Sequence, residues 1–125
     1  MSTGYTVLFI DDNETFLRHA TRFVERDPRL RVVGTARRVA EGLTTAKRLH
    51  PDVILLDLSM PERGGIEAIA DFREAAPEAR IIILTMQEAD MYRDAALQHG
   101  ADGIVSKSNM ASDLVATILR EPSAR

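Results

Sequence analysis

Short apolar runs alternate with longer amphipathic segments along the whole chain. Four of the runs are rich in β-branched residues and almost unbroken by polar ones, as expected for strands that are buried on both faces of a parallel sheet. They span residues 5–10, 53–56, 81–84 and 104–105. A weaker run at 30–35 is interrupted by Arg31 and Gly34, which is typical of an edge strand.

The segments between these runs predict five helices. Apolar residues recur at three- and four-residue spacing in most of them, which gives each helix one face for the core. Gly42 in the second lowers helix propensity by about 1 kcal/mol relative to alanine, and the apolar stripe of the fourth is ambiguous. The predicted helices span residues 13–27, 37–49, 66–76, 88–99 and 110–119.

Five strand-helix units in this order predict one α/β domain. We expect a doubly wound, five-stranded parallel sheet in the order 2-1-3-4-5 with five helices, a flavodoxin-like fold. The domain is expected to occupy residues 1–125, with a core over about 5–120 and a C-terminal tail or the start of a linker at 121–125. In this fold ligands bind past the carboxyl ends of strands 1 and 3, which are neighbours.

Composition excludes several classes of protein. The chain has 125 residues and no cysteine, which excludes a disulfide scaffold, a thiolate metal site and a cysteine nucleophile. Its net charge of −3 argues against direct nucleic-acid binding by this chain. No apolar run approaches the roughly 20 residues of a membrane span, and the first residues do not resemble a secretory signal. We therefore expect a cytoplasmic protein without a membrane contact.

Polar residues stand at four of the predicted strand ends, and each has an ordinary structural explanation. Asp12, after strand 1, could cap the first helix together with Asn13. Thr85, after strand 4, opens a sequence that matches a capping box. Lys107, after strand 5, could be a solvated surface lysine. Asp57, directly after the most apolar run, is harder to explain in this way.

The combination favours a phosphoryl-transfer site. If strands 1 and 3 are adjacent, then Asp11, Asp12 and Asp57 converge. Two such charges about 4 Å apart repel by roughly 4 kcal/mol at an effective dielectric constant of 20, and a divalent cation relieves the repulsion. Oxygen ligands suit Mg²⁺, while Lys107 and the Thr85 hydroxyl can bind a phosphoryl group. Asp57 could be a metal ligand alone or also the nucleophile.

The sequence resembles the receiver domain of two-component response regulators along nearly its whole length. The motifs that carry the resemblance are LFIDD at 8–12, DVILLDLSMP at 52–61, IILT at 82–85 and GADGIVSK at 100–107. The second and fourth motifs look most like the subfamily with a C-terminal LuxR-type helix-turn-helix output. The resemblance implies a signalling domain rather than an enzyme, in a longer regulator of transcription or as a stand-alone protein.

The resemblance also implies roles for individual residues. Asp57 would be the phosphoacceptor, with Thr85 donating to a phosphoryl oxygen and Lys107 pairing with the phosphoryl group. The donor would be a sensor histidine kinase or a small acyl phosphate. Phosphorylation would switch the surface of helix 4, strand 5 and helix 5, and a homodimer could form on activation.

A Mg²⁺ site follows from the same resemblance. Asp12 would be a direct ligand and Asp11 a ligand through water, beside Asp57 and the backbone carbonyl of Ser59.

Three positions depart from the family pattern. Met86 replaces the small residue that usually follows Thr85, so we expect slow phosphotransfer. Ile104 occupies the position of the family's switch aromatic, so coupling through Thr85 is expected to differ. Ser108 replaces a proline that many receivers carry after the lysine.

Two other functions stay open at this point. Met86 and Ile104 suit a degenerate receiver that works through protein contacts without phosphorylation, although the retained polar residues argue against it. An aspartate-nucleophile phosphohydrolase would need a second acid two residues after Asp57, where Ser59 stands, and a substrate-covering cap.

Overall fold

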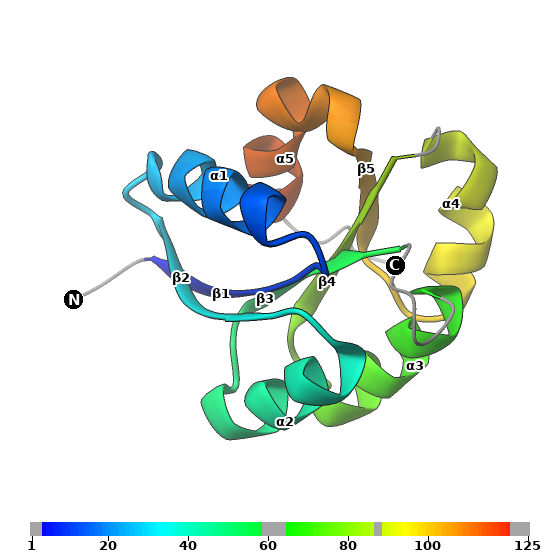
Figure 1. Cartoon of the computed structure of the whole chain (residues 1–125). Helices are drawn as coiled ribbons and strands as arrows, with labels where there is room; N and C mark the ends of the chain where they lie inside the picture. Colours follow the sequence, from blue (N-terminus) through cyan, green and yellow to red (C-terminus); the bar gives the residue numbers. More distant parts are fainter. Residues whose placement is uncertain (1–3, 59–64, 87–88, 121–125) are drawn as a thin grey trace.

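A five-stranded parallel sheet forms the centre of the molecule (Figure 1). The computed structural model describes residues 4–58, 65–86 and 89–120. The strand order is β2-β1-β3-β4-β5, as predicted, and all neighbouring strands pair in parallel. The strands are β1 (Tyr5–Ile10), β2 (Leu30–Ala36), β3 (Val53–Asp57), β4 (Arg80–Thr85) and β5 (Gly103–Ser106).

Helices cover both faces of the sheet. In Figure 1, α1 and α5 lie over one face, and α2 and α3 lie over the other. The helices are α1 (Glu14–Glu25), α2 (Val39–Leu49), α3 (Gly65–Ala75), α4 (Ala89–Gln98) and α5 (Met110–Leu119), with a short 3-10 helix at Lys107–Asn109 before α5. In the part of the chain that the structure describes, none of these helices could cross a membrane.

The pleat of the strands divides the core into two layers. Val7 and Phe9 of β1 pack with the buried residues of α1 and α5, whereas Leu8 and Ile10 pack with those of α2 and α3. These four side chains are completely buried. Successive residues of a strand point to opposite faces of the sheet. A side chain at the end of a strand can therefore contact only the helices that cover its own face.

The predicted strands and helices are confirmed with small changes at their ends. Asp57 is the last residue of β3 and Thr85 the last residue of β4. β5 extends to Ser106, so that Lys107 follows it directly. The weak strand β2 is an edge strand, as predicted, and its pairing with β1 shifts register between Val7 and Leu8.

Gly42, the unfavourable residue of α2, is explained by a close approach. A Cβ atom at this position would lie 2.9 Å from Cγ1 of Ile10 and 3.0 Å from Cζ of Phe72. Both neighbours are completely buried. The glycine therefore lets α2 pack directly against β1 and α3.

Candidate functional site

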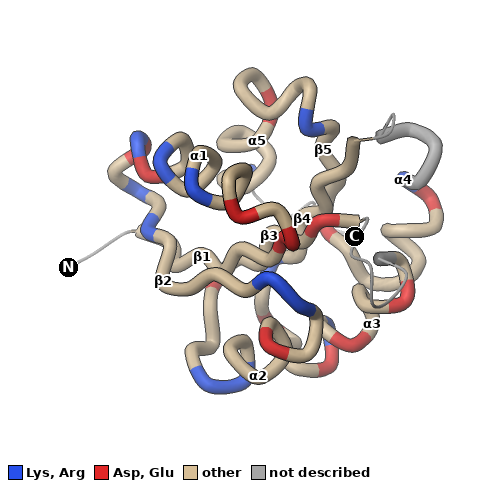
Figure 2. Tube along the Cα trace, viewed as in Figure 1, with Lys and Arg blue, Asp and Glu red and all other residues tan. Residues whose placement is uncertain are grey.

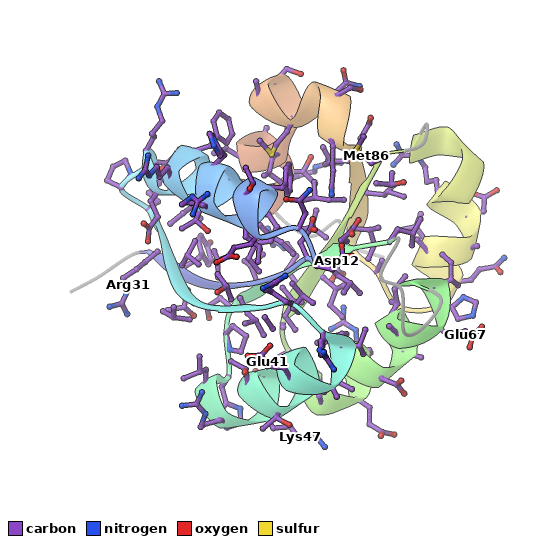
Figure 3. All side chains as sticks on the ribbon, viewed as in Figure 1. Asp12, Arg31, Glu41, Lys47, Glu67 and Met86 are labelled. Atoms are coloured by element: carbon purple, nitrogen blue, oxygen red, sulfur yellow. The ribbon has the colours of Figure 1, made fainter. Side chains whose placement is uncertain are left out.

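Three carboxylates meet at the carboxyl end of the sheet. Asp11 follows β1 and Asp57 ends β3, and these strands pair with Ile10 opposite Leu56. Asp11, Asp12 and Asp57 each offer an oxygen such that all three atoms lie within 4.8 Å of one another. Figure 3 shows Asp12 at this edge, close to where β1 meets β3 and β4. The predicted convergence of the three residues is confirmed.

The burial of the three carboxylates is unequal. Asp11 is 0 % exposed and Asp57 1 %, whereas Asp12 is exposed. Burial of a charged carboxylate is unfavourable in free energy unless an opposite charge pairs with it. The pairing group is Lys107, whose Nζ lies 2.7 Å from Oδ2 of Asp11 and 3.5 Å from Oδ1 of Asp57. Lys107 is therefore part of the acidic cluster and not a solvated surface lysine.

The loop after β1 separates the acidic residues from the helix cap. Asn13 is the N-cap of α1, and its Oδ1 accepts a hydrogen bond of 2.9 Å from the backbone N–H of Phe16. Oδ1 of Asp11 in turn accepts from the backbone N–H of Asn13 at 2.9 Å. The alternative in which Asp12 caps the helix is wrong, which leaves the exposed carboxylate of Asp12 at the mouth of the cluster.

Thr85 is the last residue of β4 and is buried, with 2 % of its surface exposed. The capping-box alternative fails because α4 begins only at Ala89, four residues later. Asp57 pairs with Leu84 in the sheet, so Thr85 stands one position beyond the residue that faces Asp57. The structure thus brings Thr85 to the same edge as the carboxylates.

Phe16, one of the apolar residues whose spacing predicts the first helix, also lies in this region. Its ring centroid lies 4.1 Å from Nζ of Lys107, the geometry of a cation–π contact. The ring also packs edge-on against Phe9, with centroids 6.0 Å apart and planes at 81°. The signal in the sequence is weak: Phe16 is the first of two phenylalanines among the apolar residues of this helix, and it is the one that lies close to the acidic pair.

The donor set fits a divalent cation. Two oxygen ligands of one Mg²⁺, each at about 2.1 Å, lie at most about 4.2 Å apart. The spacing of up to 4.8 Å between the carboxylate oxygens is slightly wider, so a small side-chain movement or a bridging water would close it. Ser59, the other predicted ligand, lies outside the described residues.

Comparison with known proteins identifies the family to which the chain belongs. The family model of the response regulator receiver domain matches residues 7–119. The chain belongs to the response regulator receiver family. The matched range contains both buried aspartates, Thr85 and Lys107. The predicted resemblance is confirmed.

Relatives of the receiver narrow the family further. The chain is 33 % identical over 112 residues to the transcriptional regulatory protein MctR of Rhizobium johnstonii, covering 90 % of this chain and 52 % of MctR. A LuxR-family two-component response regulator from Aurantimonas has a similar solved structure, with 32 % identity and a TM-score of 0.85, over 90 % of this chain and 81 % of that one. The receiver thus belongs with the LuxR family of two-component response regulators.

A second similar structure carries a modification. It is a response regulator protein from Burkholderia pseudomallei with a phosphorylated aspartic acid, a calcium ion and citrate. The receiver is 28 % identical to it with a TM-score of 0.80, over 91 % of this chain and 66 % of that one. The receiver spans about half the length of the curated relatives it matches.

Proposed function

We propose that this receiver is a phosphorylation-controlled switch in which Asp57 accepts the phosphoryl group. The observation that carries the proposal is the pairing of two buried carboxylates, on Asp11 and Asp57, with the nearly buried ammonium of Lys107. An oxygen of Asp57 attacks the phosphorus of the donor, the new O–P bond forms and the bond from phosphorus to the leaving group breaks. The leaving group is the imidazole of a phosphohistidine or the carboxylate of an acyl phosphate.

Lys107 and Thr85 would hold the phosphoryl group. The Lys107 ammonium already lies within 3.5 Å of Asp57 and is largely shielded from water, which strengthens its attraction for the added negative charge. The hydroxyl of Thr85 would donate to a phosphoryl oxygen. These contacts of Lys107 and Thr85 with the phosphoryl group would bias the surface of α4, β5 and α5 toward its active arrangement. Since Ile104 is buried in β5, this switch works without a rotating aromatic residue.

A Mg²⁺ ion would be held by the acidic cluster. Asp12 would bind it directly, Asp11 through water, and Asp57 and the Ser59 carbonyl would complete the protein ligands. The chemistry such an ion would supply is neutralisation of the negative charge of the carboxylates and of the incoming phosphoryl group. The related structure from Burkholderia pseudomallei contains a calcium ion together with a phosphorylated aspartic acid, which supports a role for a divalent cation in this receiver.

The proposed partners follow from the family. We propose a sensor histidine kinase as donor, a homodimer on activation, and signalling without turnover of a separate substrate. The single domain would span residues 1–125, with a tail or linker start at 121–125. A C-terminal DNA-binding domain in the same polypeptide is supported by the half-length coverage of relatives such as MctR. A cytoplasmic location completes the proposal.

The test is the intact mass of the protein after incubation with acetyl phosphate and Mg²⁺. We expect one phosphoryl group to be gained, and none in Asp57→Asn or without a divalent cation. Asp94→Asn is the matched control, because it removes an exposed carboxylate of α4 and should leave the gain unchanged.

Two results would overturn the proposal. One is the same mass gain in Asp57→Asn. The other is no gain with acetyl phosphate or with a phosphorylated kinase, which would favour the interaction module that works without phosphorylation.

A further inference from the structure

The ammonium of Lys107 is enclosed by three groups. The ammonium donates to Asp11 and forms an ion pair with Asp57 at 3.5 Å, and the centroid of the Phe16 ring lies 4.1 Å from Nζ. Only 11 % of the Lys107 side chain is exposed, so little water reaches it. An aromatic face attracts a cation most strongly when both are withdrawn from water.

A closed chain of contacts holds Phe16 in this place. Lys107 donates to Oδ2 of Asp11 at 2.7 Å, while Oδ1 of the same carboxylate accepts from the backbone of Asn13. The Asn13 side chain accepts from the backbone of Phe16, and the Phe16 ring returns to Lys107. The fully buried Phe9 packs against the ring in a T-shaped contact, with the two centroids 6.0 Å apart. The aromatic face is therefore fixed relative to the acidic cluster by both its backbone and its ring.

Resting on the proposed function, we propose that Phe16 is a positioning residue for Lys107 during phosphoryl transfer. In the structure Lys107 lies closer to Asp11 than to Asp57. To pair with a phosphoryl group on Asp57, its ammonium would turn from Asp11 toward the phosphoryl oxygens. The ring can attract the ammonium throughout this movement, because a neutral π face attracts the charge but does not bind a particular N–H. Phe16 thereby keeps the ammonium over Asp57 and excludes water that would weaken the interaction.

A simpler role for Phe16 is packing, since it also borders the core layer of α1 and α5. The two roles differ in their dependence on the electrons of the ring. Fluorine atoms withdraw density from the π face and change the volume of the ring only slightly. A series of mono-, di- and trifluorinated phenylalanines at position 16 therefore weakens the cation–π attraction stepwise while it preserves the packing.

The experiment measures the rate of phosphorylation by acetyl phosphate with Mg²⁺ across this series. We expect a stepwise fall that reaches about five- to tenfold with the trifluorinated ring, and a similar fall in Phe16→Leu. The matched control is the same series at Phe23, which also lies in α1 and borders the same core layer. That control should leave the rate unchanged.

A second readout does not require phosphorylation. The ring current of Phe16 should shift the nuclear magnetic resonance signals of the Lys107 ε-methylene protons upfield, and Phe16→Leu should abolish the shift. An upfield shift in the unmodified protein together with the stepwise loss of rate supports the proposal, whereas an unperturbed shift overturns it.

The proposal is overturned if the unmodified protein is phosphorylated but the series at Phe16 leaves the rate unchanged, or if the series at Phe23 lowers it equally. If the unmodified protein accepts no phosphoryl group from any donor, the proposed function fails and this inference fails with it. The two failures are therefore distinguishable.

Discussion

Met86 follows Thr85 directly at the end of β4, and Figure 3 places it toward the same end of the sheet as Asp12. Its side chain is 73 % exposed, the largest exposure among the bulky apolar residues that the structure describes. We predict that the thioether chain hinders a donor that approaches Asp57 from this end of the sheet. We expect Met86→Ala to raise the rate of phosphorylation threefold or more, about 0.7 kcal/mol of activation free energy. Intact-mass kinetics with acetyl phosphate measure this rate.

The matched control for Met86→Ala is Leu97→Ala. Leu97 is also a large exposed apolar residue, but it lies in the last turn of α4. Its replacement should leave the rate unchanged. An unchanged rate in Met86→Ala would show that the Met86 side chain does not slow phosphotransfer.

Asp27 and Arg29, between α1 and β2, form a local ion pair that sets a pH dependence. The Arg29 guanidinium donates to both oxygens of Asp27 at 3.0 and 2.7 Å, and the Arg29 backbone N–H also donates to it. These hydrogen bonds lower the pKa of Asp27 from 3.8 to about 2. The pair therefore stabilises the fold at pH values above the ordinary pKa, and this contribution is lost as the pH falls toward 2.

The measurement is a nuclear magnetic resonance titration of the Asp27 carboxyl carbon. We expect a midpoint near 2 in the natural sequence and a return toward 3.8 in Arg29→Ala. Arg31→Ala, which removes an exposed arginine two residues further on, should leave the midpoint where it is. Equal midpoints in all three proteins would contradict the pairing.

Helix α2 is positioned by a glycine at a close contact, and this makes its response to mutation unusual. Alanine is the better helix former by about 1 kcal/mol, yet a Cβ at Gly42 would meet Ile10 and Phe72 at 2.9 and 3.0 Å. Overpacking of a tight core costs about 1–3 kcal/mol. We expect Gly42→Ala to lower the free energy of unfolding by about 1 kcal/mol, as measured by urea denaturation.

Ala40→Gly supplies the comparison for α2, because Ala40 is exposed in the same helix and reports propensity without packing. It should lower the free energy of unfolding by up to about 1 kcal/mol. A Gly42→Ala protein that is more stable than the natural one would show that α2 has room to move away from the sheet.

The molecule as a whole has an uneven distribution of charge. Figure 2 shows many Lys and Arg positions along α1 and around β2 and α2, where a few Asp and Glu positions also lie, and Asp and Glu positions along α3 and at the carboxyl end of the sheet. Asp12, the exposed member of the acidic cluster, therefore adds to the negative charge at this end of the sheet. Such a field raises the local concentration of cations, but salt screens it over about 10 Å at 0.1 M.

The carboxylates of the acidic cluster predict that Mg²⁺ raises the thermal stability of the protein. A cation that binds only the folded protein adds about 1.4 kcal/mol at ten times its dissociation constant. For a domain of this size that corresponds to a rise of about 5 °C in the melting temperature. We expect this rise with Mg²⁺ in differential scanning calorimetry, and its loss in Asp12→Asn. An equal rise of the melting temperature in Asp12→Asn would show that the ion binds elsewhere. Asp113→Asn, which changes a carboxylate of α5, is the control and should show the same rise as the natural sequence.

Periodicity and motif spacing were enough to predict the sheet order, the five helices and the meeting of Asp11, Asp12 and Asp57. The reason is that burial repeats at two residues in a strand and at three to four in a helix, so the pattern is local. In a parallel sheet all carboxyl ends lie at one edge. The position of a polar residue at a strand end therefore already indicates where it will lie.

Other features depend on contacts between distant parts of the chain. Lys107 reaches Asp11 across 96 positions, and the Phe16 ring joins them because α1 covers the same face of the sheet. Arg73 looks like an ordinary helix residue, yet it donates to the carbonyls of Gly100 and Ala79 and ties α3 to the loops beside β4 and β5. Such contacts are set by side-chain packing in three dimensions, for which the spacing of residues carries no signal. The course of the chain could thus be read from its pattern, while the environment of the Lys107 ammonium was decided only when the layers packed together.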